Sequence, residues 1–137
     1  MRIGGWPGVA ITVAFLVAGL AACGPSAPTP PANGDSGMVI TAVSGPTCPV
    51  ERDPPDPACA PRPVAGAEVR ILTPDGQDVA RVRLDGAGRA TIAIAPGAYV
   101  VTALPVAGLL GTPAPVPVTV VADGFAPVDL VYDTGIR

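Results

Sequence analysis

Apolar and polar residues alternate through most of the chain after residue 37. Val69 and Ile71 alternate with Glu68 and Arg70, and similar segments recur every eight to twelve residues or so, roughly the spacing of short strands. A period of two is typical of antiparallel strands with one buried face and one solvated face. We therefore predict seven strands, at residues 38–44, 67–72, 78–84, 89–94, 98–104, 116–121 and 126–132.

Turn signals separate these segments. Pro74-Asp75-Gly76, Asp85-Gly86-Ala87-Gly88, Pro96-Gly97 and Asp123-Gly124 combine residues that preset or permit sharp backbone reversals. The 137 residues include 17 Gly and 19 Pro, which fits short strands joined by tight turns. We expect residues 38–137 to form one all-β domain, a seven-stranded antiparallel Greek-key β-sandwich with a core of small aliphatic side chains.

The N-terminal residues follow a different pattern. Arg2 precedes an uncharged run of about fifteen residues that ends at Ala22, shorter than the roughly 20 residues of a membrane-spanning helix. The run closes with Leu20-Ala21-Ala22-Cys23, which resembles the lipobox of bacterial lipoproteins. The resemblance implies a signal peptide at 1–22, cleavage before Cys23 and a lipid anchor on its thiol. An ordinary signal peptide followed by an incidental cysteine is the alternative.

Residues 23–37 have the composition of a tether. Four prolines lie between Gly24 and Gly37, and no aliphatic side chain larger than Ala occurs there. Two acyl chains on Cys23 are sufficient for stable attachment to a membrane. The expected location is therefore the cell membrane, with the domain facing the periplasm or the cell exterior.

Cys48 and Cys59 form an even pair once Cys23 carries a lipid. A domain outside the reducing cytosol favours a disulfide between them, which would close the Pro-rich segment 49–58. A redox centre would need Cys-x-x-Cys, and a zinc site would need further His or Cys ligands, which the chain lacks.

Three segments resemble the carboxypeptidase regulatory-like family. They are Pro63-Val-Ala-Gly-Ala-Glu-Val-Arg-Ile71, Gly88-Arg-Ala-Thr-Ile-Ala-Ile-Ala-Pro-Gly-Ala-Tyr-Val-Val101 and Val128-Asp-Leu-Val-Tyr-Asp133. The similarity covers roughly residues 38–133 and implies a transthyretin-like sandwich. It implies no catalytic activity, because the zinc peptidase domain that accompanies this module elsewhere is absent.

The residue inventory argues against several kinds of chemistry. The chain has no His and a net charge of −3, so a general base at neutral pH and a basic nucleic-acid surface are both missing. Ser26, Ser36 and Ser44 lie in the tether or at its edge without an activating partner. Asp75, Asp78 and Asp85 are interpreted as turn residues. We expect no enzyme, no cofactor and no nucleic-acid partner.

Glu51, Asp53 and Asp56 leave one metal hypothesis open. These carboxylates could offer oxygen ligands to calcium, but the prolines between them oppose a compact cage. A solvated acidic loop is the interpretation we favour, so no metal site is assigned.

Leu109 and Leu110 mark a possible binding loop. They lie between Gly108 and Gly111 in the Pro-rich segment 104–117, where they could plug one end of the sandwich or form an apolar tip that grips a partner. The expected function is non-catalytic: a membrane-tethered module for binding, adhesion or assembly with an envelope partner. A small-ligand or carbohydrate-binding accessory domain is the alternative. Partner identity and oligomeric state are left open by the sequence.

Overall fold

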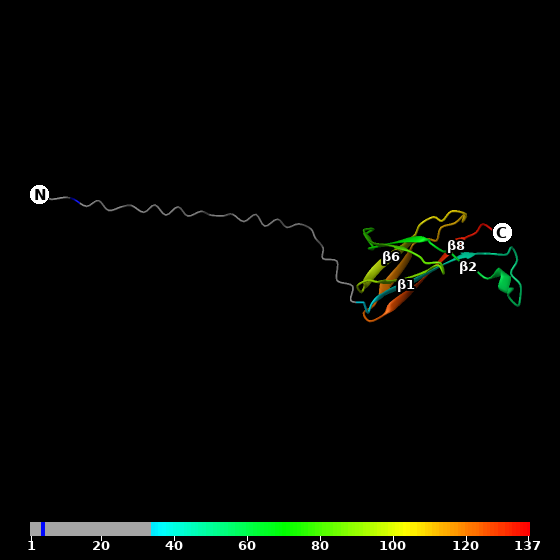
Figure 1. The fold of residues 1–137 in the computed structure, drawn as a ribbon, viewed down its shortest axis with the longest axis horizontal. Helices are drawn as coiled ribbons and strands as arrows, with labels where there is room; N and C mark the ends of the chain where they lie inside the picture. Colours follow the sequence, from blue (N-terminus) through cyan, green and yellow to red (C-terminus); the bar gives the residue numbers. More distant parts are fainter. Residues whose placement is uncertain (1–3, 5–33) are drawn as a thin grey trace.

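The computed structural model describes Gly4 and residues 34–137, and the latter form two β-sheets packed face to face (Figure 1). The elements are β1 Gly37–Gly45, the 3-10 helix η1 Pro57–Cys59, β2 Arg62–Pro63, β3 Glu68–Leu72, β4 Asp78–Arg83, β5 Arg89–Ala93, β6 Gly97–Ala103, β7 Val116–Val120 and β8 Phe125–Asp133. The predicted all-β sandwich is confirmed, and each predicted strand lies within one residue of an observed strand at both ends.

The first sheet is built around β1. β8 pairs with β1 along its whole length, while β5 pairs with its first half and β2 with its end. The second sheet has the order β4-β3-β6-β7. The chain passes between the sheets after β2, after β4, after β5 and again after β7, as in a Greek-key sandwich.

One strand pair departs from the expected antiparallel arrangement. β1 and β8 are parallel, with Gly37 opposite Phe125 and Gly45 opposite Asp133. The physical reason is the crossover from β7, because its turn delivers the chain to the end of the first sheet where β1 also begins. Two further elements, β2 and η1, were not predicted, since both are very short and lie among prolines.

The core lies between the two sheets and follows the period of two. In β1 the side chains of Met38, Ile40 and Ala42 are fully buried, and the residues between them face outward. Burial of each large aliphatic side chain stabilises the fold by about 1.5–3 kcal/mol. The largest fully buried side chains are Tyr132, Met38, Ile40, Ile71, Leu130, Val69, Val101, Val120 and Val128.

Gly88 lies where two backbone segments come too close for a side chain. Its φ is +67°, and a Cβ there would lie 2.5 Å from the carbonyl oxygen of Ala42 and 2.9 Å from the nitrogen of Val64. Glycine adopts this left-handed conformation without steric cost. The close approach joins the start of β5 to β1.

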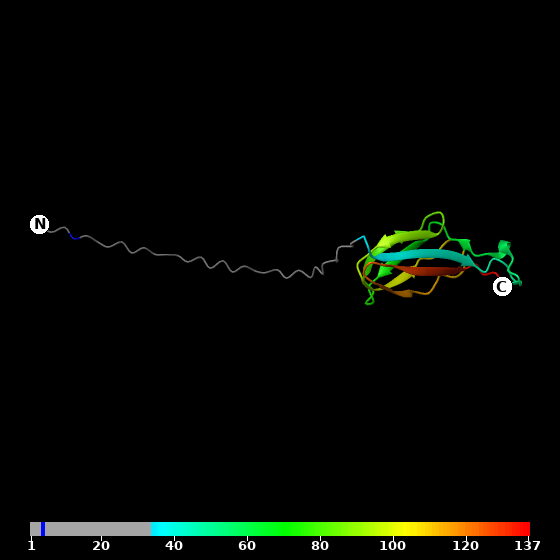
Figure 2. The same ribbon diagram turned by 90° about the horizontal axis from the view of Figure 1, so that it is seen from below.

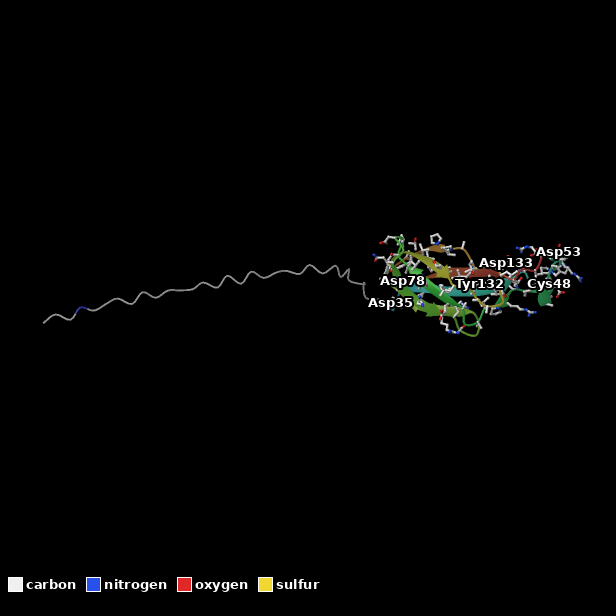
Figure 3. The ribbon with its side chains drawn as sticks, turned by 90° about the horizontal axis from the view of Figure 1, so that it is seen from above. Asp35, Cys48, Asp53, Asp78, Tyr132 and Asp133 are labelled. Carbon is white, nitrogen blue, oxygen red and sulfur yellow. A yellow bond between two sulfur atoms is a disulfide. The ribbon has the colours of Figure 1, made fainter. Side chains whose placement is uncertain are left out.

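The sandwich has two distinct ends, and the tether enters at one of them. The Gly37 amide donates to the Gly124 carbonyl at 3.0 Å, and the Ile94 amide donates to the Ser36 carbonyl at 3.0 Å. We call this end the tether end. The opposite end, where β1 and β8 finish, carries the segments 46–61 and 104–115 and is called the far end. Figure 3 places Asp35 and Asp78 at the tether end and Cys48 and Asp53 beyond the far end.

Candidate functional site

A disulfide closes the longest segment of the far end. Cys48 and Cys59 are bonded, with their Cα atoms 5.3 Å apart, as predicted from the cysteine count. The Thr47 hydroxyl donates to the carbonyls of Cys59 and Ala60 beside the bond. All residues from 49 to 58 are exposed, so the closed segment projects from the sandwich and takes its shape from the clamp at its base.

The acidic residues of this segment do not form a common site. Asp56 caps η1, because its Oδ1 accepts the Ala58 amide at 2.9 Å. Glu51 and Asp53 are exposed. Within residues 34–137, no three Cys, Asp or Glu side chains gather closely enough to hold a metal ion. A shallow depression of about 390 Å³ is lined by Glu51, Arg52, Pro55, Asp56, Pro57, Cys59, Ala60 and Pro61.

The structure separates the two leucines of the other far-end segment. Leu109 is half-buried and packs against the hydrophobic core, whereas Leu110 is 81% exposed. Backbone bonds fix this difference, since the amides of Leu110 and Gly111 both donate to the Asp133 carbonyl, at 2.9 and 3.1 Å. The plug and the exposed tip are therefore adjacent residues with different environments.

The C-terminal residues brace the same end. The Gly135 amide donates to Asp133 Oδ1 at 2.8 Å, and Arg137 Nη2 lies 3.1 Å from Asp133 Oδ2. The Gly135 bond first, and Arg137 second, hold the pKa of Asp133 below its ordinary value. The Thr134 hydroxyl donates to the Pro46 carbonyl, which connects these residues to the base of the disulfide segment.

The other aspartates have structural roles that differ from one another. Asp85 Oδ1 accepts the amides of Ala87 and Arg89, both at 2.9 Å, as expected for a turn residue. Asp75 is exposed in its turn. Asp78 is not a turn residue but begins β4, where it forms an ion pair with Arg70 that lowers its pKa. Sequence spacing misses this pair because a register shift at the end of β3 brings the two residues together.

The serines in the described part donate to backbone carbonyls. Ser36 Oγ donates to Ile94 at 2.9 Å, and Ser44 Oγ donates to Arg62 at 3.3 Å. Both residues are buried. Their hydroxyls stabilise the edges of β1 and have no neighbouring base in the hydrogen-bond network.

Aromatic side chains are mostly withdrawn from the surface. Tyr132 is fully buried and donates to the Leu104 carbonyl at 2.9 Å, while the half-buried Tyr99 donates to the Ala95 carbonyl at 2.7 Å. Burial raises the pKa of both hydroxyls. Among aromatic residues of the described part, Phe125 alone is exposed, at 41%, and it lies at the tether end.

The predicted lipidation site falls outside the described residues. Cys23, Ser26 and the signal segment 1–22 belong to the part of the chain that the structure does not describe. Among the described residues, no helix has the length and apolar character needed to cross a bilayer.

Two facing sheets without an α-helix in residues 34–137 define the class of the fold as an all-β sandwich. The chain is structurally similar to GBS52, the minor pilin of the Gram-positive pathogen Streptococcus agalactiae, with a TM-score of 0.55 and 16% sequence identity. The similarity covers 72% of this chain and 44% of the pilin chain, less than half of that protein. No protein-family model and no curated protein sequence matches the chain. At this identity the likeness concerns the fold alone.

Proposed function

We propose that this chain is a lipid-tethered, extracytoplasmic β-sandwich that presents its far end to an envelope partner protein. The role is non-catalytic binding, adhesion or assembly. The observation that carries the proposal is the separation of the two ends: residues 34–36 enter at one, and the disulfide segment and Leu110 project from the other. A domain held to a membrane by one end offers the opposite end to other molecules.

Several independent features support this proposal. The disulfide is a bond of oxidising compartments, which favours a location outside the cytosol. The segments quoted above for the carboxypeptidase regulatory-like family fall on β3, β5, β6 and β8 of a sandwich, in agreement with that assignment. The protein with a similar fold is a minor pilin, and assembly is the corresponding role we propose here. Cys23 is proposed as the lipidated residue.

Leu110 is the side chain we expect to contact the partner. It is 81% exposed, and its backbone is fixed by bonds to Asp133, so little conformational freedom is lost on binding. An exposed aliphatic side chain on a fixed backbone is suited to fill an apolar pocket of a partner. The carbohydrate alternative is less well supported, because the exposed ring of Phe125 lies at the tether end.

Site-specific photo-cross-linking in producing cells tests the proposal. A photoreactive residue at Thr112, two residues after Leu110, is expected to give a discrete protein adduct. Leu110→Ser in the same chain is expected to reduce the yield of this adduct several-fold. A photoreactive residue at Val121 is the matched control, because Val121 is 62% exposed at the tether end. Equal adducts at both positions, or an adduct unchanged by Leu110→Ser, would contradict the proposal.

Melting curves separate binding from folding in this experiment. Leu110→Ser is expected to leave the melting temperature unchanged, because the side chain is largely in solvent. Leu109→Ser is expected to lower it, because Leu109 packs on the core.

A further inference from the structure

The outward face of the first sheet is mainly apolar. Its register places three-residue rows across β1, in which Val39 lies between Thr91 and Pro127, and Val43 lies between Pro63 and Val131. Val131 is 59% exposed. Figure 2 shows β1 and β8 side by side at the front of the molecule with no other element covering them. Such a face is typical of an interaction surface rather than of a solvated sheet.

The outer face of the second sheet is charged over β3 and β4. Its outward positions include Arg81 and Arg83 on β4 and Glu68 and Arg70 on β3. Arg83 pairs with Glu68 and Arg70 pairs with Asp78, as expected for a face in contact with water. Charge is therefore spread along β3 and β4, whereas the rows of the first sheet from Gly37 to Val43 carry charge in one row only.

One row of the first sheet carries opposite charges at its two sides. Thr41 lies between Arg89 on β5 and Asp129 on β8, and these are the charged residues of the rows from Gly37 to Val43. Because neighbouring strands are about 4.8 Å apart, the two charged residues are about 10 Å apart across β1. Both are exposed, and neither forms an ion pair within residues 34–137.

We propose that this face binds a second copy of the chain, in an isologous dimer whose two-fold axis runs parallel to β1. This axis sets Arg89 of each copy opposite Asp129 of the other, with the two β1 strands facing each other across the interface. The apolar rows on either side of Thr41 then pack together at the roughly 10 Å spacing of stacked sheets.

Charge selects this orientation over the alternative. A two-fold axis perpendicular to β1 and in the plane of the interface would place Arg89 opposite Arg89 and Asp129 opposite Asp129, and like charges in contact oppose association. In the favoured orientation both copies of β1 point the same way. Both tether ends then lie on the same side of the dimer, so two copies can share one membrane.

The edge of the first sheet at β8 is less suited to self-association. Because the Gly37 amide bonds to Gly124, the register directs the nitrogen of Pro127 away from β1, to the free edge of β8, where it cannot donate. At the end of the same edge, the backbone amide and carbonyl of Asp133 are hydrogen-bonded to Gly111. Proline and a covering segment are common protections against edge-to-edge pairing, so this edge of the first sheet is protected.

Sedimentation velocity of the full-length protein in mild detergent tests the dimer. The wild-type chain is expected to sediment as a dimer over a dilution series. Arg89→Asp and Asp129→Arg alone are each expected to raise the dimer dissociation constant about tenfold or more. The double variant Arg89→Asp/Asp129→Arg is expected to restore association, because it exchanges the two charges without changing their complementarity.

Arg81→Asp is the matched control, because it reverses an exposed arginine on the other sheet. It is expected to leave association unchanged, and the melting temperature of each variant verifies folding. A monomeric wild-type chain would overturn the proposal, as would a dimer that tolerates both single reversals. Loss of vesicle binding by a Val131→Asp variant of a monomeric wild-type chain would assign the face to a lipid surface instead. The dimer concerns the sheet face, so its failure leaves the proposed far-end function standing.

Discussion

Two tyrosine hydroxyls illustrate how single side chains support the backbone at the ends of β6. Tyr132 is fully buried in β8, and its hydroxyl reaches the Leu104 carbonyl, where β6 gives way to the segment 104–115. Tyr99 closes the turn before β6 by donating to Ala95. Each ring packs against a core of small side chains while its hydroxyl remains hydrogen-bonded. No buried side-chain oxygen or nitrogen of the described residues is therefore left without a hydrogen-bond partner.

Replacement of Tyr132 by phenylalanine is expected to destabilise the domain by about 1 kcal/mol at neutral pH, because the Leu104 carbonyl loses its donor. Urea unfolding measures this change. Burial raises the pKa of Tyr132 above 10.0, so its contribution is fully present below pH 10 and is lost as the pH rises through the folded-state pKa. The variant is therefore expected to lose less stability than the wild type between neutral pH and pH values above 10. An identical alkaline loss in both proteins would contradict this role.

The disulfide segment is an element held by a few bonds at its base. Residues 49–58 are all exposed and none belongs to the hydrophobic core, and η1 is a single turn capped by Asp56. Thr47 joins the two ends of the segment, and Thr134, directly after β8, attaches its base to the sandwich. The stability of this element therefore depends on the cross-link and not on packing.

Replacement of Cys48 and Cys59 together by alanine is expected to lower the free energy of unfolding by about 3 kcal/mol, the chain-entropy value for a loop of this size. The sequence separation of the two cysteines is 11 residues. Urea unfolding with and without reductant measures the loss. Intact mass of the wild-type protein provides the control, since two free thiols in the exported chain would contradict the bridge.

At the scale of the whole molecule, the position of the tether decides what the domain can reach. Residues 34–36 enter beside Gly124 and Ile94, at the end opposite the disulfide segment. With the proposed lipid on Cys23, the tether end faces the membrane and the far end faces outward. The proposed dimer keeps this orientation in both copies.

Replacement of Cys23 by alanine is expected to move the protein from the membrane fraction to the soluble fraction, because the acyl chains supply the attachment. Cell fractionation followed by immunoblotting measures the shift. Cys48→Ala is a useful control, since it also removes a cysteine but leaves the proposed anchor in place. Unchanged membrane attachment of the Cys23→Ala protein would contradict the lipid assignment.

Local sequence patterns determined the strand positions and the disulfide of this protein. The period of two in segments such as Glu68–Leu72 places apolar side chains on one face, and Asp-Gly and Pro-Gly pairs end the strands, so strand positions follow from short-range chemistry. The cysteine count determined the Cys48–Cys59 bond in the same way. These features depend on residues that are neighbours along the chain or limited in number.

Long-range relations were decided only by the tertiary structure. Leu109 and Leu110 are identical residues between two glycines, and only the bonds to Asp133 separate the packed side chain from the exposed one. The parallel direction of β8, and with it the alignment of Arg89 and Asp129 on either side of Thr41, depends on how strands far apart in sequence meet. The physical reason is that alternation along a strand fixes which face a side chain occupies but contains no information on which strand lies beside it or in which direction.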